Sequence, residues 1–236
     1  MNTLAIRNRQ PEVMDEPGLD ERLHHQALEG LRRGNFVSNT SRVLWRGLEA
    51  SGVLRRAAPI RVLDLACGGG DVCLGLARLA RRRSIRVEVH GADVSPLAIE
   101  HARAAAERAG VTDVRYFRLN ALLDDLPRNY DAIYCTLFLH HLSETDGVDL
   151  LRRMAAATRC VVLVDDLVRT RLGFALVWIG CHLLTRSPVV HTDGPLSVRA
   201  ALTIEEARKL AERAGLRDIT IERHWPERFL LHWRKP

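Results

Sequence analysis

The sequence predicts an α/β protein with a doubly wound, mostly parallel sheet. From residue 60 onward, short apolar runs alternate with segments of helical periodicity, a pattern typical of parallel strands joined by crossover helices. A run of three glycines follows the first apolar run. In doubly wound sheets the ligand lies beyond the carboxyl ends of the strands, so this glycine turn indicates a binding site there.

The region before the sheet is predicted to be helical. Residues 1–16 are polar and expected to be loose, and two helices follow at residues 19–33 and 36–50, joined around Gly34-Asn35. Residues 1–55 are therefore expected to form a tail and a helical extension of the same domain.

Seven strands are predicted for the sheet. They span residues 60–65, 86–93, 114–119, 132–136, 160–164, 219–223 and 228–233. The helices between them span residues 72–82, 95–110, 143–158 and 203–215. Ser95, Ser143 and Thr203 supply the side-chain oxygens that cap helix N-termini. Trp225-Pro226 separates the last two strands, which are expected to pair as an antiparallel hairpin.

An insertion at about residues 168–202 precedes the last helix of the main domain, residues 56–236. It begins with the apolar helix Leu172–Leu184, which is too short to cross a bilayer. A polar stretch that contains His191 and Asp193 follows. Long insertions of this kind often act as lids, so we predict that the insertion, together with the N-terminal helix pair, determines what the protein accepts as a substrate.

Composition and charge narrow the function classes. The formal net charge is +6, but the runs Arg55-Arg56 and Arg81–Arg83 close helical segments, where cations complement the helix dipole. Nucleic acid is therefore not an expected partner. The five cysteines include no CxxC pair, which favours a reducing, cytoplasmic compartment without disulfides or zinc. The N-terminus lacks an apolar core of signal-peptide length.

The glycine turn belongs to the stretch VLDLACGGGD, residues 62–71. The dinucleotide fingerprint G-x-G-x-x-G is incomplete because Asp71 stands at its third glycine position, and a phosphate-binding P-loop would need a lysine. Asp64, at the end of the strand, would repel a pyrophosphate and favour a cationic group such as an amine or a sulfonium.

Residues 60–234 resemble the class I S-adenosylmethionine-dependent methyltransferases, which have a seven-stranded, Rossmann-like sheet. The resemblance implies that the glycine turn receives the methionine part of the cofactor and that Asp64 anchors its amino group. Asp93, in VHGADVSPLAIEHAR, matches the acid that binds both ribose hydroxyls. Asn120, in FRLNALLDDLP, stands where the family has an acid that meets the adenine amino group. Ala66 replaces the first glycine, which a tight turn tolerates if its φ stays negative.

The implied cofactor is S-adenosylmethionine, with S-adenosylhomocysteine as product and no metal. The residues expected to bind it are Asp64, Ala66, Gly68, Gly70, Asp93, Val94, Asn120 and Ala121. A dinucleotide-binding protein, and a protein that binds the cofactor without transferring its methyl group, are the alternatives.

A pair of histidines follows the fourth strand, in the stretch TLFLHHL. It resembles the LHHL and LEHV stretches of methyltransferases that act on ubiquinone and menaquinone precursors. By that resemblance His140 is the general base and His141 packs into the protein. The alternative is that both histidines are hydrogen-bonded scaffold.

A magnesium route of the catechol methyltransferase type is a further alternative. It would use Asp165-Asp166 after the fifth strand and an acid after the fourth strand. Thr136 and Leu137 stand at the place after the fourth strand, and neither replaces the carboxylate that magnesium prefers. Without a metal, Asp165 and Asp166 are expected to form a solvated strand end beside the site.

The resemblance implies a small, largely apolar acceptor of a phenolic, quinonoid or polyketide-like kind, as in secondary metabolite biosynthesis. O-methylation is the favoured reaction; C-methylation of an activated ring, or methylation of RNA or protein, are the alternatives. Trp178, His191 and Arg199 of the insertion are the expected acceptor-binding residues, because ligand pockets combine apolar walls with a few polar groups. The apolar helix also suits a transient contact with a membrane surface. The oligomeric state is left open.

Overall fold

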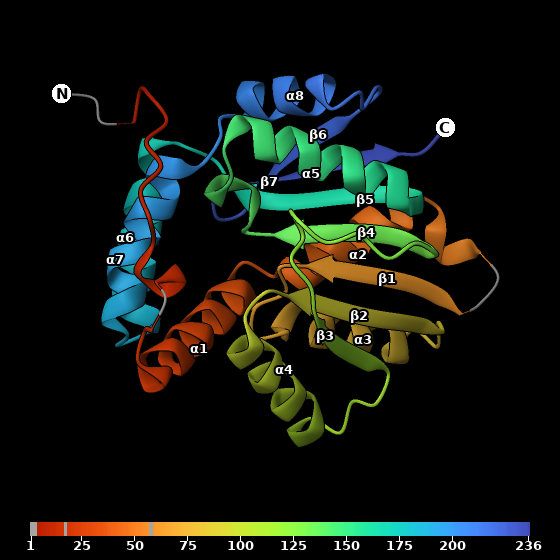
Figure 1. The fold of residues 1–236 in the computed structure, drawn as a ribbon, viewed down its shortest axis with the longest axis horizontal. Helices are drawn as coiled ribbons and strands as arrows, with labels where there is room; N and C mark the ends of the chain where they lie inside the picture. Colours follow the sequence, from red (N-terminus) through yellow and green to blue (C-terminus); the bar gives the residue numbers. More distant parts are fainter. Residues whose placement is uncertain (1–3, 17, 57–58) are drawn as a thin grey trace.

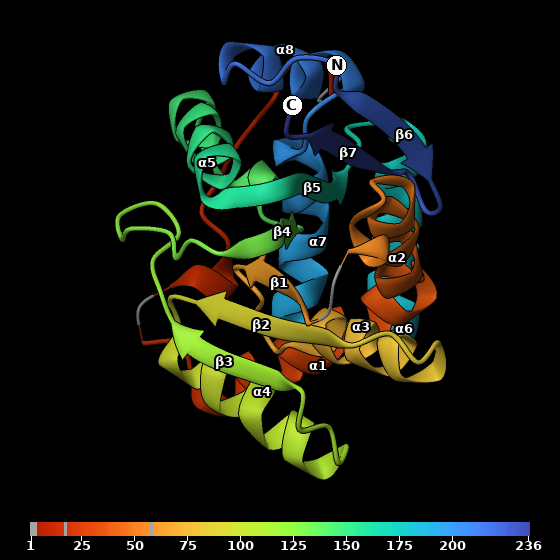
Figure 2. The same ribbon diagram turned by 90° about the vertical axis from the view of Figure 1, so that its right-hand side faces the viewer.

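The computed structural model describes residues 4–16, 18–56 and 59–236. A seven-stranded sheet in the order β3-β2-β1-β4-β5-β7-β6 forms its centre (Figures 1 and 2). The strands are β1 (Ile60–Leu65), β2 (Val87–Asp93), β3 (Val114–Arg118), β4 (Tyr130–Thr136), β5 (Thr158–Leu167), β6 (Thr220–His224) and β7 (Arg228–Arg234). The first five pair in parallel, and β7 pairs antiparallel to both β5 and β6. The predicted doubly wound sheet with a closing hairpin is therefore confirmed.

Helices cover both faces of the sheet. The helices are α1 (Glu21–Val37), α2 (Thr40–Ala50), α3 (Asp71–Arg82), α4 (Pro96–Arg108), α5 (Glu144–Ala157), α6 (Arg171–Leu184), α7 (Pro188–Ala200) and α8 (Ile204–Arg213), with short 3-10 turns η1 (Val13–Asp15), η2 (Val53–Arg55) and η3 (Leu139–His141). Side chains of α2, α3 and α4 build the core with Ile60 and Val62 of β1, whereas those of α5 and α8 pack with Leu63 and Leu65. Two cores separated by one sheet follow from the alternation of side chains along a strand.

The predicted break between the first two helices was wrong. Helix α1 continues through Gly34-Asn35 to Val37, and the chain turns instead at Asn39, whose φ is 56°. Asparagine adopts this left-handed conformation more readily than most residues do. The side chain of Asn35 also bridges to the next helix, because its carbonyl oxygen accepts hydrogen bonds from Thr40 and Arg228.

The polar half of the insertion is a helix, which the sequence analysis did not predict. Helix α7 contains Gly194-Pro195 in its middle, a pair that normally indicates a turn. A Cβ atom added at Gly194 would lie 2.5 Å from the sulfur of Cys181 on α6. The glycine therefore serves the close approach of α6 and α7, and not a turn.

Residues 4–16, the N-terminal segment, are held by contacts with the rest of the chain, contrary to the prediction that residues 1–16 are loose; residues 1–3 lie outside the described residues. Residues 4–16 run along α7 (Figure 1), and the guanidinium of Arg7 donates hydrogen bonds to the carbonyls of His140, Leu142 and Ala200. The backbone amide of Asn8 donates to the carbonyl of Arg199. These non-local bonds, which no local pattern encodes, fix the segment against the end of the sheet.

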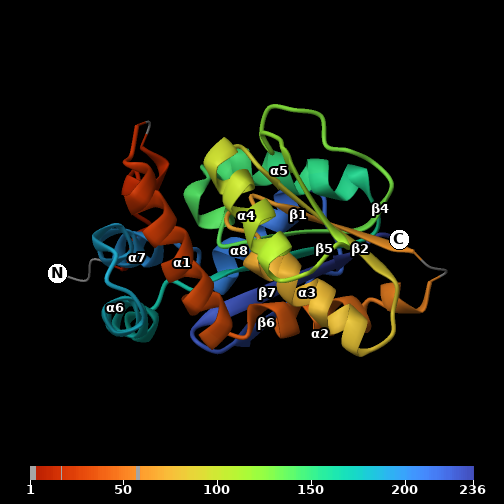
Figure 3. The same ribbon diagram turned by 90° about the horizontal axis from the view of Figure 1, so that it is seen from below.

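The carboxyl ends of β1 and β4 point towards α1, α6, α7 and the N-terminal segment (Figure 1), and Figure 3 shows these helices together beside the sheet. The N-terminal extension and the insertion that contains α6 and α7, which we call the lid after its predicted role, therefore both stand at the edge where the glycine turn and the two histidines lie. Among the described residues, no helix combines the length and apolar character that crossing a bilayer requires.

Candidate active site

The glycine turn between β1 and α3 is built from residues with positive φ. Ala66, Gly68 and Gly70 have φ values of 56°, 50° and 72°. The condition under which a tight turn tolerates Ala66, a negative φ, is therefore not met, and the residue is held in a backbone conformation that favours glycine. At Gly70 a Cβ atom would lie 2.5 Å from the hydroxyl of Tyr116, which donates a hydrogen bond to the Gly70 carbonyl. Only glycine fits there.

Asp93 joins the end of β2 to the glycine turn. One carboxylate oxygen accepts the amide of Gly68 at 2.8 Å, and the other accepts the amide of Ser95 at 2.9 Å. The sheet register explains this meeting, because Asp64 and Leu65 of β1 pair with Gly91 and Ala92 of β2. The two oxygens of a carboxylate match the two hydroxyls of a vicinal diol, which is the ligand that the resemblance assigns to this position.

Asp64 lies beneath the turn and is 0% exposed. One of its oxygens accepts a hydrogen bond from the thiol of Cys73 at 3.3 Å, and the other has no hydrogen-bond partner among the described residues. Burial raises the pKa of this carboxyl group well above its usual range. A cationic group close to Asp64 would lower this pKa again, because it favours the ionised carboxylate, and could donate a hydrogen bond to the second oxygen.

The structure gives the side chain of Asn120 a different role from the one that the resemblance implied. Its side-chain carbonyl accepts the amides of Leu122 and Leu123 at 3.0 and 3.2 Å, so both lone pairs already stabilise the turn after β3. The amide N–H groups of Asn120 are then the part that can meet a ligand. Of its predicted neighbours in the site, Val94 is exposed and Ala121 is buried.

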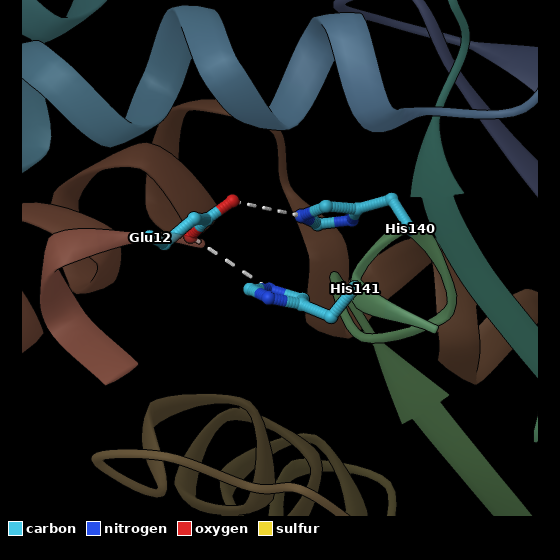
Figure 4. Close-up of side chains that lie close together, drawn as sticks. All are labelled: Glu12, His140 and His141. Atoms are coloured by element: carbon cyan, nitrogen blue, oxygen red, sulfur yellow. Dashed lines mark ion pairs between the residues drawn. The ribbon is translucent and has the colours of Figure 1, made fainter. Parts of the chain in front are cut away.

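His140 lies on η3, directly after β4, and is 3% exposed. Its Nδ1 is 2.6 Å from a carboxylate oxygen of Asp166, and its backbone amide donates to the other oxygen at 3.1 Å. Burial lowers the pKa of His140, but the carboxylates of Asp166 and Glu12 outweigh this effect and raise the pKa to about 9. Asp166 therefore fixes the imidazole ring and directs Nε2 away from the sheet, towards Glu12 (Figure 4).

Residues 62–160 match the family of methyltransferase domains. The chain contains a class I S-adenosylmethionine-dependent methyltransferase domain. The ubiquinone biosynthesis O-methyltransferase of Xanthomonas campestris pv. campestris is 29% identical over 129 residues, which cover 53% of this chain and 51% of that protein. The demethylmenaquinone methyltransferase of Thermus thermophilus is 34% identical over 122 residues, covering 50% and 53%. The chain thus spans about half the length of these curated relatives.

Solved structures agree with the fold of the methyltransferase domain. The O-methyltransferase NcsB1 from neocarzinostatin biosynthesis, in complex with S-adenosylhomocysteine and 1,4-dihydroxy-2-naphthoic acid, has a TM-score of 0.67 at 16% identity, covering 92% of this chain and 59% of that one. Magnesium protoporphyrin IX methyltransferase from Synechocystis PCC 6803, with bound S-adenosylhomocysteine, has a TM-score of 0.59 at 16% identity, covering 94% and 91%.

In the methyltransferase domain, Asp165 and Asp166 are not a solvated strand end, and that expectation was wrong. Both are buried. Asp165 accepts a hydrogen bond from Nε of Arg228 at 2.6 Å, and Asp166 holds His140. Because both carboxylates are engaged by cationic or ring groups, the arrangement does not suit a magnesium site of the catechol methyltransferase type.

The predicted acceptor-binding residues lie on the lid in two groups. Trp178 is 50% exposed and its ring packs on that of His182, which in turn stacks on His191 with ring centroids 4.3 Å apart. The guanidinium of Arg199 lies over the ring of Phe174, and Phe174 packs in a cluster with Leu137, directly after β4. Arg199 is therefore linked to the loop that carries the histidines, whereas Trp178 and His191 line the α6–α7 surface.

Glu12 is a residue of the site that the sequence analysis missed. Its carboxylate is buried, and one oxygen lies 3.7 Å from Nε2 of His140 while the other lies 3.8 Å from Nε2 of His141 (Figure 4). No local motif marks Glu12, since 128 residues or more separate it from the histidines in the chain. Only the path of the N-terminal segment brings it there.

Proposed function

We propose that this protein transfers a methyl group from S-adenosylmethionine to a hydroxyl oxygen of a small, largely apolar acceptor. The observation that carries the proposal is the bond between Asp93 and the Gly68 amide. It brings the ribose-binding acid and the glycine turn together at the sheet edge that also bears His140. The phenolic, quinonoid or polyketide-like class of acceptor, and a role in secondary metabolite biosynthesis in the cytoplasm, are parts of the same proposal.

The residues present fit the cofactor. The buried oxygen of Asp64 that has no hydrogen-bond partner among the described residues suits its amino group. The two carboxylate oxygens of Asp93 suit the ribose hydroxyls, and the side-chain N–H groups of Asn120 suit the adenine ring. The positive-φ turn lets the backbone approach the ligand closely. When bound, the cofactor supplies a methyl group that its sulfonium has already activated.

The protein's own contribution is then to align the acceptor and to promote loss of its hydroxyl proton. We assign this activation to His140, which Asp166 orients; because its pKa is raised to about 9, the neutral form that accepts the proton is the minor one near neutral pH. The names of the relatives support the acceptor class, since ubiquinone and demethylmenaquinone methyltransferases act on quinone-type molecules. Phe174 and Val177 of α6 pack in a cluster with Leu137, directly after β4, and supply the apolar wall that such an acceptor needs.

A transient contact of α6 with a membrane surface is a further part of the proposal. Leu172, Trp178, Ile179 and Leu183 are all large, apolar and exposed. An apolar acceptor partitions into lipid, so a lid that touches the surface would collect it there.

The test is the transfer of labelled methyl from S-adenosylmethionine in a lysate of the host, followed by phase separation. Label in the organic extract would support a small apolar acceptor, and carbon NMR of the product would show whether a methoxy or a C-methyl group forms. Label in precipitated RNA or protein would overturn the proposal. A variant with Asp93→Ala serves as the inactive control.

A further inference from the structure

Three side chains with metal-binding atoms converge at the end of the sheet. Glu12 comes from the N-terminal segment, and His140 and His141 come from η3. One carboxylate oxygen of Glu12 and one ring nitrogen of each histidine all lie within 4.8 Å of one another. Figure 4 shows the carboxylate facing both rings from across the site.

The separations within this cluster are longer than hydrogen bonds. The Glu12 oxygens lie 3.7 Å from Nε2 of His140 and 3.8 Å from Nε2 of His141, whereas N–H···O bonds have lengths of about 2.7–3.2 Å. Two ligands bound to zinc at about 2.1 Å with tetrahedral angles are about 3.4 Å apart. The two distances from Glu12 are therefore a few tenths of an ångström above this spacing, and the widest separation among the three donor atoms, at most 4.8 Å, would have to shorten by up to about 1.4 Å.

His140 is already arranged as a metal ligand. Its Nε2 is buried and has no hydrogen-bond partner in the part of the chain that the structure describes. Its Nδ1 is held by Asp166 at 2.6 Å. A histidine that binds a metal through one nitrogen almost always donates its other N–H to a carboxylate or carbonyl group, so Asp166 supplies the expected outer partner.

Glu12 is held in the same way. The hydroxyl of Ser197 donates to one of its carboxylate oxygens at 2.6 Å. The next two backbone amides, of Val13 and Met14, donate to the two carboxylate oxygens of Asp193 on α7 at 2.9 and 3.0 Å. The carboxylate is thus fixed from both its side chain and its backbone.

We propose that Glu12, His140 and His141 bind a divalent transition metal of the zinc type. Two imidazoles and one carboxylate match the donors that zinc takes at open sites, whereas magnesium prefers oxygen ligands. This inference departs from the metal-free protein that the sequence predicted. His141 is a quarter exposed, which gives a fourth ligand access from that side.

One consequence rests on the proposed function. An acceptor hydroxyl at the fourth position would lose its proton more readily, because a bound divalent cation lowers the pKa of a coordinated hydroxyl. The proton passes to solvent, the oxygen forms its bond to the methyl carbon, and the electron pair of the broken carbon–sulfur bond stays on sulfur. This role would replace direct proton uptake by His140.

Metal binding is tested on the full chain without a histidine tag, stripped with a chelator and titrated with Zn²⁺ in a calorimeter. We expect one equivalent to bind, and affinity to fall about 10-fold to 100-fold in Asp166→Asn and further in His140→Ala and Glu12→Gln. The control variants His182→Ala and Glu205→Gln, on exposed residues, should bind as the wild type does. Visible absorption of the Co²⁺-loaded protein should indicate nitrogen and oxygen ligands, and Glu12→Gln should weaken it.

Absence of stoichiometric binding to the folded wild-type protein would overturn the proposal, as would unchanged binding in Glu12→Gln and His140→Ala. Far-UV circular dichroism shows whether each variant is folded. These titrations contain neither cofactor nor acceptor, so their outcome is independent of methyl transfer. Metal binding without label transfer to any extract would contradict the proposed function alone.

Discussion

Ala66 shows the cost of departing from the family pattern at a single position. Its φ of 56° places an L-residue in a conformation that costs roughly 1–2 kcal/mol relative to the right-handed region. Glycine has no such penalty. The residue that replaces the first glycine of the family pattern is therefore a strained point of the turn.

We predict that Ala66→Gly stabilises the protein by about 1 kcal/mol, because the relief of left-handed strain exceeds the extra chain entropy of glycine. Urea denaturation at constant slope measures this change. Ala104→Gly, in the interior of α4, is the matched control and should destabilise by about 1 kcal/mol. A loss of stability of equal size in both variants would contradict the account of the turn.

Individual site residues could be predicted from the sequence where they stand at the carboxyl end of a strand. Asp93 stands at the end of β2, where its bond to Gly68 now supports the predicted place. Asn120 was found at the right strand end, but its carbonyl is used by the backbone of its own turn. Glu12 was missed, because its position depends on tertiary bonds of the N-terminal segment such as those made by Arg7.

Among the elements, the lid is anchored by a two-bond contact between Arg169 and Glu206. Two guanidinium nitrogens donate to the two carboxylate oxygens, each at 2.7 Å. Arg169 also donates to the carbonyls of Ala201 and Leu4. One buried arginine therefore connects the end of β5, the end of the lid, the start of α8 and the N-terminal segment.

This contact predicts a pH dependence of stability. The hydrogen bonds that Arg169 donates lower the pKa of Glu206 to about 2. In an unfolded chain the pKa of a glutamate is about 4.3. The stabilisation is therefore present above pH 4.3 and is lost as the pH falls towards 2. With allowance for solvent screening of a partly exposed group, Glu206→Gln should lower the Tm at pH 7 by about 2–4 °C, corresponding to about 1 kcal/mol.

Thermal melting of both proteins between pH 7 and pH 2.5 checks this prediction, and the difference in Tm should shrink at the acid end. Glu205→Gln is the control, because Glu205 is exposed and pairs only with the exposed Lys209 among the ion pairs described. A difference in Tm that stays constant with pH would show that Arg169 stabilises the lid by packing and not by charge.

The exposed apolar side chains of helix α6 predict a contact with a membrane surface. Replacing Trp178 and Leu183 with glutamate should weaken sedimentation with vesicles that contain phosphatidylglycerol by about 10-fold or more, because two exposed apolar side chains would leave the lipid interface. Leu123→Glu, on the exposed loop after β3, should bind as the wild type does. Equal binding of all variants, or none by the wild type, would exclude α6 as a membrane contact.

At the element scale, the second lid helix was the main failure of the sequence analysis. Gly194-Pro195 resembles a turn, but the glycine is required for contact with Cys181, and the helix continues through the proline. Tertiary packing overrides local propensity at such a position. The observed ends of the strands, by contrast, lie within three residues of the predicted ends. The reason is that buried parallel strands carry continuous apolar runs, which are easy to recognise in a sequence.

Over the whole molecule, the parallel sheet is the reason that the site could be anticipated at all. Its order brings the turn after β1, Asp93 after β2 and His140 after β4 to one edge. What the sequence could not show is how α1, the lid and the N-terminal segment close that edge. Their contacts are side-chain hydrogen bonds between residues more than 100 positions apart, such as Arg7 with His140 and Glu12 with Ser197.

The central claim is that this edge binds the methyl donor through Asp93. The most direct measurement is calorimetric titration of S-adenosylhomocysteine into the wild-type protein and Asp93→Ala, with Asp113→Ala as the control, since Asp113 is an exposed acid paired with Arg81. We predict binding to the wild type and the control, and an affinity at least about 10-fold weaker in Asp93→Ala, the loss expected when charge-assisted hydrogen bonds are removed. Equal affinity in all three proteins, or no binding to the wild type, would contradict the account.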